Sequence, residues 1–92
     1  MFSNETKTES ISQLKEKIIK VEALVIYNDN VNTFDHVIES LIKICSHQSE
    51  QAEQCAYIIH HKGKCVVKSG EFKKLRPMCE ALLERGLSAT IE

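Results

Sequence analysis

Three stretches of the chain place apolar residues at the spacing of an amphipathic helix. Between positions 34 and 46 the apolar residues follow the i, i+3, i+4, i+7, i+8, i+11 template without a gap. They are Phe34, Val37, Ile38, Leu41, Ile42 and Cys45. Asn32 or Thr33 can cap this helix, because a short polar side chain accepts a bond from a free backbone N–H of the first turn.

The second helical stretch follows Ser49, which we predict to be its N-cap, and ends at Gly63, which we predict to adopt the left-handed C-terminal conformation. Its apolar face carries Ala52, Cys55, Ala56 and Ile59. His60 follows Ala56 by one turn, so we expect its ring on the buried side of the helix.

The third helical stretch ends at Gly86, and its apolar stripe consists of Leu75, Met78, Cys79, Leu82 and Leu83. Pro77 interrupts it, because proline lacks an N–H donor and its ring clashes one turn back. Two interpretations remain open. The helix starts near Arg76 after a separate turn over 71–74, or it starts near Glu71 and is kinked.

Three further runs have the β-branched or alternating composition of strands, at about 19–27, 64–68 and 87–91, with a turn at Ser69 and Gly70 after the second. The order is therefore strand, helix, helix, strand, helix, strand. Since each helix has a single apolar face, we predict an α+β fold. Its three helices pack on one face of a three-stranded antiparallel sheet.

The domain organisation expected from the pattern is a flexible N-terminal extension over 1–18 followed by one core domain over 19–92. Residues 1–10 are polar and have no period. The stretch 11–18 places three isoleucine and leucine side chains on one helical face, which fits either a short helix or a linker. Ninety-two residues allow one modest core.

Composition narrows the function classes. The chain is 42% hydrophobic and 27% charged, with a formal net charge of -1, which argues against a dedicated nucleic-acid binder. No apolar run is long enough to span a bilayer, and the N-terminus lacks the layout of a secretory signal, so we expect a cytoplasmic protein without a membrane partner. The four cysteines form no CxxC pair, so we expect neither a disulfide framework nor a structural metal, and no cofactor.

Candidate chemistry lies between the first strand and the first helix, where Asn28 and Asp29 set an amide beside a carboxylate. Together with a neutral ring nitrogen of His60, they could bind an ammonium group. The small side chain of Ala56 could leave an apolar hollow nearby, with Phe34 as its lid. These groups suit a free peptide N-terminus that carries an apolar side chain. The alternative is that Asn28 and Asp29 form only a turn and cap pair.

Four short motifs, taken in order, make the chain similar to the ClpS family of bacterial adaptors, which deliver N-degron substrates to a Clp AAA+ protease. They are the strand ending in N-D-N at 28–30, F-x-x-V-I at 34–38, H-x-x-G-K at 60–64 and L-x-x-T-I at 87–91. The resemblance covers about 22–91. It implies the sandwich described above, which is similar to the C-terminal domain of the ribosomal stalk protein.

The resemblance also implies residue roles and partners. The substrate's α-amino group would be bound by Asn28, Asp29 and His60, and the hydrophobic pocket would consist of Asn32, Phe34, Val37, Ala56, Ile59 and Leu87. Glu71 and Arg76 would dock a ClpA- or ClpC-type unfoldase, with the N-terminal extension assisting delivery. The partners would be this unfoldase and N-degron substrates, bound by a monomer that is not an enzyme.

The chain departs from the family pattern at several site positions. Asn30 replaces a frequent second aspartate, Asn32 and Thr33 replace a common Thr-Pro, Phe34 replaces a methionine, and Ala56 replaces a larger residue. We expect the pocket to accept Phe, Leu, Tyr or Trp with a changed ranking. The segment between the second strand and the third helix is shorter than in many family members, and Pro77 is unusual there. Both departures concern the docking surface.

Two other function classes stay open. One is an interaction domain of the same fold without N-degron binding, in which Asn28, Asp29 and His60 serve only as caps. The other is a small enzyme or metal protein using His60, His61 and a cysteine, for which the usual ligand or general-base spacing is missing.

Overall fold

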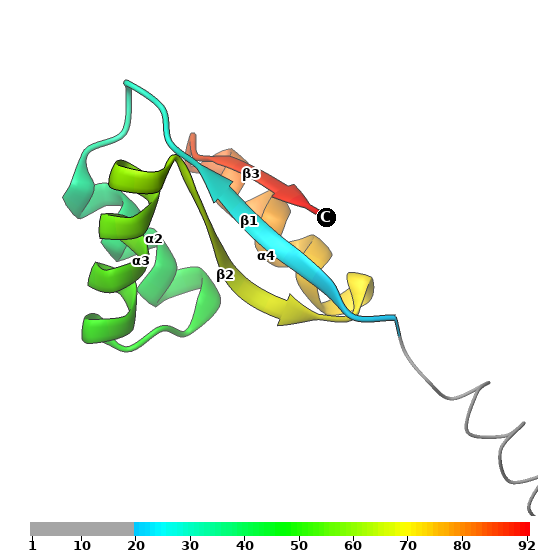
Figure 1. Ribbon diagram of the computed structural model, residues 1–92. Helices are drawn as coiled ribbons and strands as arrows, with labels where there is room; N and C mark the ends of the chain where they lie inside the picture. The colour runs from blue at the N-terminus through cyan, green and yellow to red at the C-terminus, as the bar shows by residue number, and fades with distance from the viewer. Residues whose placement is uncertain (1–19) are drawn as a thin grey trace, which may run out of the picture.

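The element order of the protein is the one predicted from the sequence, as seen in the computed structural model (Figure 1), which describes residues 20–92. The elements are β1 (Glu22–Tyr27), α2 (Phe34–Cys45), α3 (Ser49–Lys62), β2 (Lys64–Gly70), α4 (Phe72–Glu84) and β3 (Ser88–Ile91). The predicted flexible extension over 1–18 lies outside the described residues. The expected first strand starts at Glu22 rather than near position 19, and the last starts at Ser88.

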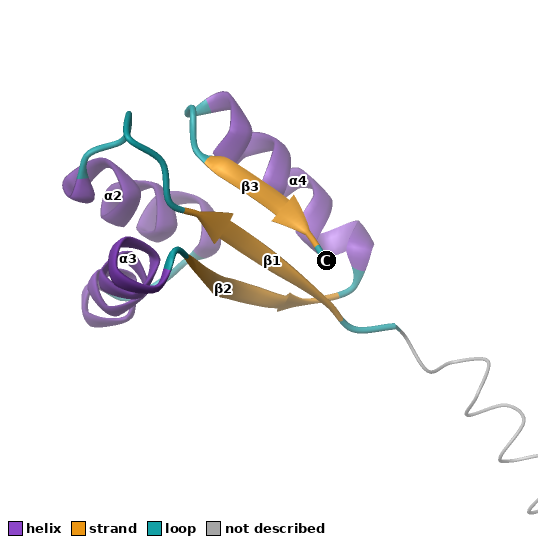
Figure 2. Cartoon of the chain, turned by 45° about the horizontal axis from the view of Figure 1, so that its top comes forward, coloured by secondary structure: helices purple, strands orange, loops and turns teal. Residues whose placement is uncertain are grey.

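The sheet has the strand order β2-β1-β3, and both pairs are antiparallel. In the central strand, Ile26 lies opposite Cys65 on one side and Ala89 on the other. A register shift between Leu24 and Val25 marks a β-bulge in the β1–β2 pair. The helices cover one face of this sheet, with α4 behind β1 and β3, and with α2 and α3 towards β2 (Figure 2). The predicted α+β fold is therefore confirmed.

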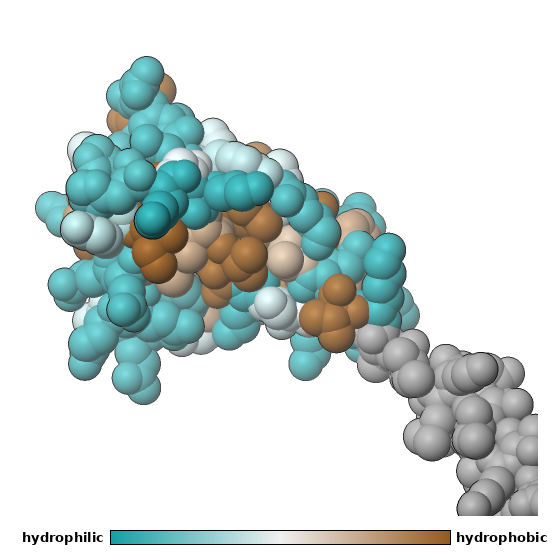
Figure 3. Space-filling model, viewed as in Figure 1, coloured by the Kyte–Doolittle hydropathy of each residue, from teal (hydrophilic) through white to brown (hydrophobic). Residues whose placement is uncertain are grey.

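The core lies between the sheet and the helices. Its largest fully buried side chains include Leu24, Ile26, Leu41, Leu75 and Leu82, and each such burial stabilises the fold by about 1.5–3 kcal/mol. On the opposite side, apolar side chains are visible over the strands (Figure 3), and Val66 of β2 is 52% exposed. The helices therefore leave one face of the sheet uncovered within residues 20–92.

The cysteines behave as small apolar side chains. Cys45, Cys55 and Cys79 are buried and Cys65 is half-buried, and all four are free thiols. Burial raises the pKa of Cys45 to about 11, so this thiol is not ionised at neutral pH. Among the described residues, no group of three histidine, cysteine or acidic side chains could hold a metal. In the same residues, no helix is long and apolar enough to cross a membrane.

The starts of α2 and α3 match the predicted caps only in part. Thr33 caps α2, with its Oγ1 accepting from the His36 N–H at 3.1 Å, as one of the two predicted caps. The prediction that Ser49 caps the next helix was wrong, because Ser49 is its first residue and Gln48 occupies the cap position. In the link before α3, the ring of His47 donates to the Val67 carbonyl at 2.7 Å.

The third predicted helix is one element, α4, and it starts at Phe72 with Glu71 as its N-cap, so the interpretation that it starts near Arg76 was wrong. Pro77 lies inside the helix with an exposed side chain. The prediction that Leu83 belongs to the apolar stripe of this helix was wrong, because Leu83 is 51% exposed. The predicted turn at Ser69–Gly70 was also wrong, because β2 continues through both residues and pairs with the start of β1.

Candidate functional site

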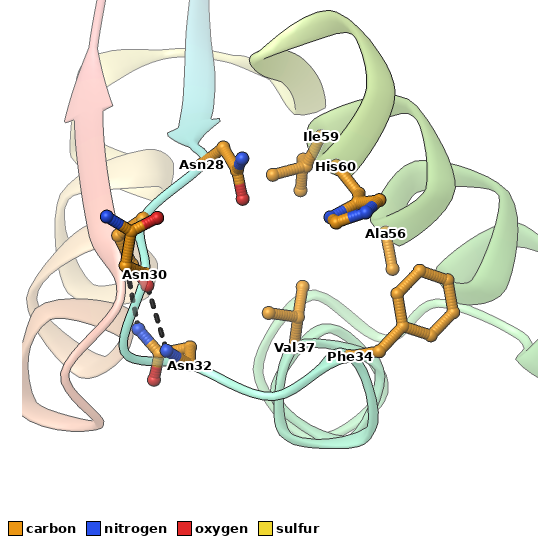
Figure 4. Close-up of a pocket in the computed structure, with 9 residues that line it drawn as sticks. Asn28, Asn30, Asn32, Phe34, Val37, Ala56, Ile59 and His60 are labelled. Atoms are coloured by element: carbon orange, nitrogen blue, oxygen red, sulfur yellow. Dashed lines mark hydrogen bonds between the residues drawn. The ribbon is translucent and has the colours of Figure 1, made fainter.

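A cavity of about 440 Å³ opens where the loop after β1 meets α2 and α3 (Figure 4). Its lining consists of Asn28, Asp29, Asn30, Asn32, Phe34, Val37, Ala56, Ile59 and His60. All three side chains predicted for the amine site are present, together with five of the six predicted for the hydrophobic pocket. The structure therefore brings together residues that are up to 32 positions apart in the chain, counting from Asn28 to His60.

The apolar wall comes from the two helices that pack against each other. Ala56 and Ile59 of α3 are only 2% and 3% exposed, and Val37 of α2 faces them across the hollow (Figure 4). The single methyl group of Ala56 leaves space beside it. The Phe34 ring lies next to Ala56 at the edge of the pocket and is 44% exposed. Phe34 is thus a rim residue and not part of the core.

The polar side of the pocket is formed by the end of β1 and the last turn of α3, where Asn28 and His60 both point towards the hollow (Figure 4). The Asn28 backbone N–H donates to the Gly63 carbonyl at 2.8 Å. Gly63 has a φ of 95°, in the left-handed region that glycine tolerates best, and this conformation was predicted. The turn at Gly63 therefore holds the two side chains on the same side of the fold.

The prediction that His60 lies on the buried side of its helix was wrong. Ile59 takes the core-facing position, and the 100° rotation to the next residue turns His60 outwards to an exposed position at the pocket rim. Its ring makes an edge contact with His61 at 5.0 Å between centroids, and His61 in turn stacks on Tyr57 at 4.1 Å. His60 is therefore accessible to a ligand.

Asp29 organises the loop that borders the pocket. Its Oδ1 accepts from the Val31 N–H at 2.9 Å and the Asn32 N–H at 2.8 Å, and its Oδ2 accepts from Asn32 Nδ2 at 2.7 Å. These bonds, the Asn32 backbone N–H foremost, lower the pKa of the Asp29 carboxyl below its ordinary value. Asp29 is thus a negative charge at the pocket and also the turn-forming residue of the alternative interpretation.

One predicted pocket residue lies elsewhere, and one residue that lines the cavity was not predicted. Leu87 is 3% exposed and packs in the core cluster, so it is not among the residues that line the cavity. Asn30 lines the cavity although it was considered only as a departure from the family pattern. Its position within the N-D-N loop was the available signal, since a loop that contributes two of its residues to a pocket brings the third close.

The two predicted docking residues lie at the start of α4. Glu71 is half-buried and lines a shallow hollow together with Lys20, Glu22, Phe72 and Lys73. Arg76 is outside this hollow, and its Nε lies 3.2 Å from Glu80 Oε2 in an exposed ion pair. Nothing in this geometry tests their assignment to docking, which stays a prediction.

A sequence model described as "ATP-dependent Clp protease adaptor protein ClpS" matches residues 20–90. Among curated relatives, the Clp protease adapter protein ClpS of Campylobacter jejuni is 39% identical over 57 residues, which is 62% of this chain and 59% of that protein's length. The ClpS of Streptomyces coelicolor is 28% identical over 68 residues, 74% of this chain and 71% of the relative.

A solved structure, that of Agrobacterium tumefaciens ClpS2 bound to L-phenylalaninamide, has the same fold. It superposes with a TM-score of 0.75 at 21% identity and covers 82% of this chain and 98% of that one. A segment of the E3 ubiquitin-protein ligase UBR1 of Drosophila melanogaster is 38% identical over 50 residues, 54% of this chain but 3% of that protein.

Proposed function

Because the chain belongs to the ClpS family of Clp protease adaptors, we propose that it binds the first residue of N-degron substrates and delivers them to a ClpA- or ClpC-type AAA+ unfoldase. The ligand would be a free α-amino group together with a bulky hydrophobic side chain. The chain would act without catalysing a reaction itself, since binding and delivery need no bond to be made or broken.

The observation that carries this proposal is one cavity with a polar side and an apolar side. The amide oxygen of Asn28 and a ring nitrogen of neutral His60 can accept from an ammonium group, and ionised Asp29 supplies the negative charge. Hydrogen bonds that involve a charged group contribute about 1.5–3 kcal/mol each. Two or three such bonds orient an α-amino group at the entrance.

The apolar side would hold the first side chain of the substrate. Filling the hollow beside Val37, Ala56 and Ile59 with a Phe, Leu, Tyr or Trp side chain adds about 1.5–3 kcal/mol. The sum with the amine contacts approaches -8 kcal/mol, an affinity of about 1 μM. The half-exposed Phe34 ring and the small Ala56 would alter the ranking of these side chains.

The fold neighbour supports this ligand class. Agrobacterium tumefaciens ClpS2 is bound to L-phenylalaninamide in its structure. That molecule carries a free α-amino group and a benzyl side chain, the two features that the cavity of this chain would recognise.

The delivery step rests on the second surface. We assign unfoldase docking to Glu71 and Arg76 near the start of α4, and assistance in delivery to the extension over 1–18. Of these two residues, Arg76 is exposed and Glu71 is half-buried.

A degradation assay tests the whole proposal. A reporter that starts with Phe should be degraded faster by a purified Clp unfoldase and its protease when this chain is added, and a reporter that starts with Ser should not respond. Equal rates for the two reporters would contradict the proposal.

A second candidate, an interaction domain of this fold without N-degron binding, is favoured by the bonds of Asp29. Its carboxylate is already occupied by loop donors. Under this alternative the chain would still bind the unfoldase, but free Phe peptides would not compete with any partner.

A further inference from the structure

The turn between α4 and β3 contacts the helix and the loop that form the pocket. The Gly86 carbonyl accepts from Asn32 Nδ2 at 2.8 Å, and the Arg85 carbonyl accepts from His36 Nε2 at 2.9 Å. Both carbonyls become available because the chain reverses here, with Gly86 at a φ of 87°. Two consecutive peptide groups of this turn therefore hold the residues that flank the start of α2.

The side chain of Arg85 adds two more contacts to the same helix. Its Nε donates to Ser40 Oγ at 2.8 Å, and its Nη2 donates to Glu39 Oε1 at 2.7 Å. Ser40 is fully buried, and its hydroxyl donates in turn to the His36 carbonyl at 2.7 Å. Arg85 thus joins the solvent-facing and the buried sides of α2.

These bonds form a closed circuit. The Arg85 side chain reaches His36 through Ser40, and the His36 ring returns to the Arg85 backbone. A helix held at two points, about one turn apart, can neither rotate about its axis nor slide along it without breaking a bond. Val37, which follows His36 directly, lines the cavity, and Phe34 lies half a turn earlier.

The amine side of the cavity is held by different contacts. Asn28 is tied to Gly63 through its backbone, and His60 stands on α3. Within residues 20–92 the side chain of Arg85 bonds Ser40 and Glu39 and does not contact Asn28, His60 or Gly63. The circuit therefore governs one half of the pocket.

We propose that Arg85 is a positioning residue that sets the rotation of α2 and, through Phe34 and Val37, the selectivity of the pocket among first side chains. This inference rests on the proposed function, because it concerns the ligand class that the cavity takes. Arg85 does not line the cavity and leaves the recognition of the α-amino group to Asn28, Asp29 and His60.

The test compares peptide binding by the wild-type chain and Arg85→Ala. Three peptides are measured, starting with Phe, with Ala, or with N-acetylated Phe. We expect Arg85→Ala to weaken binding of the Phe peptide by about tenfold, because the lost bonds include one to a buried hydroxyl. The effect on the Ala peptide should be smaller. The relative loss on acetylation should be unchanged.

Two further variants separate positioning from general stability. Glu39→Gln removes the ion pairs of Glu39 with Arg85 and Lys43 but leaves the Arg85–Ser40 bond in place, so it should bind like the wild type. Arg85→Lys retains the charge but cannot form the fork to both Ser40 and Glu39, and should lie between wild type and Arg85→Ala. If Arg85→Ala lowers the melting temperature yet leaves the Phe-to-Ala preference intact, Arg85 is only structural and the inference is overturned.

Failure of the proposed function gives a different result. If the wild-type chain binds the free and the N-acetylated Phe peptide with equal affinity, amine recognition itself is contradicted. In that case amide hydrogen exchange over 34–40 tests the role of Arg85 separately. Faster exchange in Arg85→Ala than in the wild type supports the proposal that Arg85 fixes α2. Unchanged exchange refutes it.

Discussion

The two ends of this molecule handle their polar groups in opposite ways. At the pocket, the loop carrying Asp29 and Asn32 is fixed by hydrogen bonds to itself and to the α4–β3 turn. At the start of α4, the one side-chain partner of Arg76 within residues 20–92 is Glu80, in an exposed ion pair, and Phe72 is 49% exposed. A cavity with fixed walls suits selective binding of a small ligand, whereas an open surface suits a large partner.

The largest expected effect is at the fixed end. Asp29→Ala removes the charge and the acceptor of three N–H groups, and we predict that the Phe peptide binds about 100-fold more weakly, corresponding to about 2.7 kcal/mol. Calorimetric titration measures this change. Ser88→Ala, which removes only a 3.4 Å contact to Asp29, is the matched control and should stay within about twofold.

Asp29→Asn sharpens the same result. The amide retains an acceptor for the loop but loses the charge, so it separates loop support from attraction of the ammonium group. Wild-type affinity in Asp29→Asn would show that the charge is dispensable, and the pocket would then depend on loop shape alone.

Filling the hollow should have the next largest effect. Ala56→Leu places three more carbon atoms where the first side chain of the substrate would lie, and we predict about tenfold weaker binding of Phe and Trp peptides, with overpacking costing about 1–3 kcal/mol. Anisotropy titrations with both peptides measure it. Unchanged affinity for both would mean that the first side chain does not enter beside Ala56.

A smaller effect is expected at the open end. Arg76→Ala breaks an exposed ion pair, which contributes about 0–1 kcal/mol to stability. We predict unchanged peptide affinity and a fold that melts as before, but a degradation rate of the Phe reporter reduced by about threefold, because one docking contact is lost. If peptide affinity falls as well, the two ends are not independent.

The smallest effect is a pH dependence of the loop. The folded-state pKa of Asp29 is lowered, so its contribution to stability is present above the unfolded value and is lost as the pH falls through the lower folded value. Stability should therefore decline below a pH of about 3.9. Thermal melts of the wild type and Asp29→Asn compare the slopes, and identical slopes would contradict this account of Asp29.

The fold could be predicted because periodicity reports which face of each element is buried. The helix starting at Phe34 and the left-handed Gly63 follow from local patterns. The start of α3 could not be predicted from cap preference, because Gln48 takes the extended cap position next to Ser49 without forming a side-chain cap bond.

The site was predictable to the extent that its residues form short motifs. Asn28 and Asp29 are adjacent, and His60 has a fixed spacing to Gly63. The resemblance to the ClpS family places Leu87 in the pocket, but the sequence does not determine which way its side chain faces, and it packs in the core. The support from Arg85 has no local signal, since its partners lie 45 and more positions earlier.

The central claim is that the cavity binds a free peptide N-terminus. Fluorescence anisotropy with two labelled peptides tests this claim most directly. One peptide starts with free Phe, and the other is identical but N-acetylated. We predict an affinity of about 1 μM for the free peptide and loss of binding on acetylation. Equal binding of both peptides, or binding of neither, would contradict the claim.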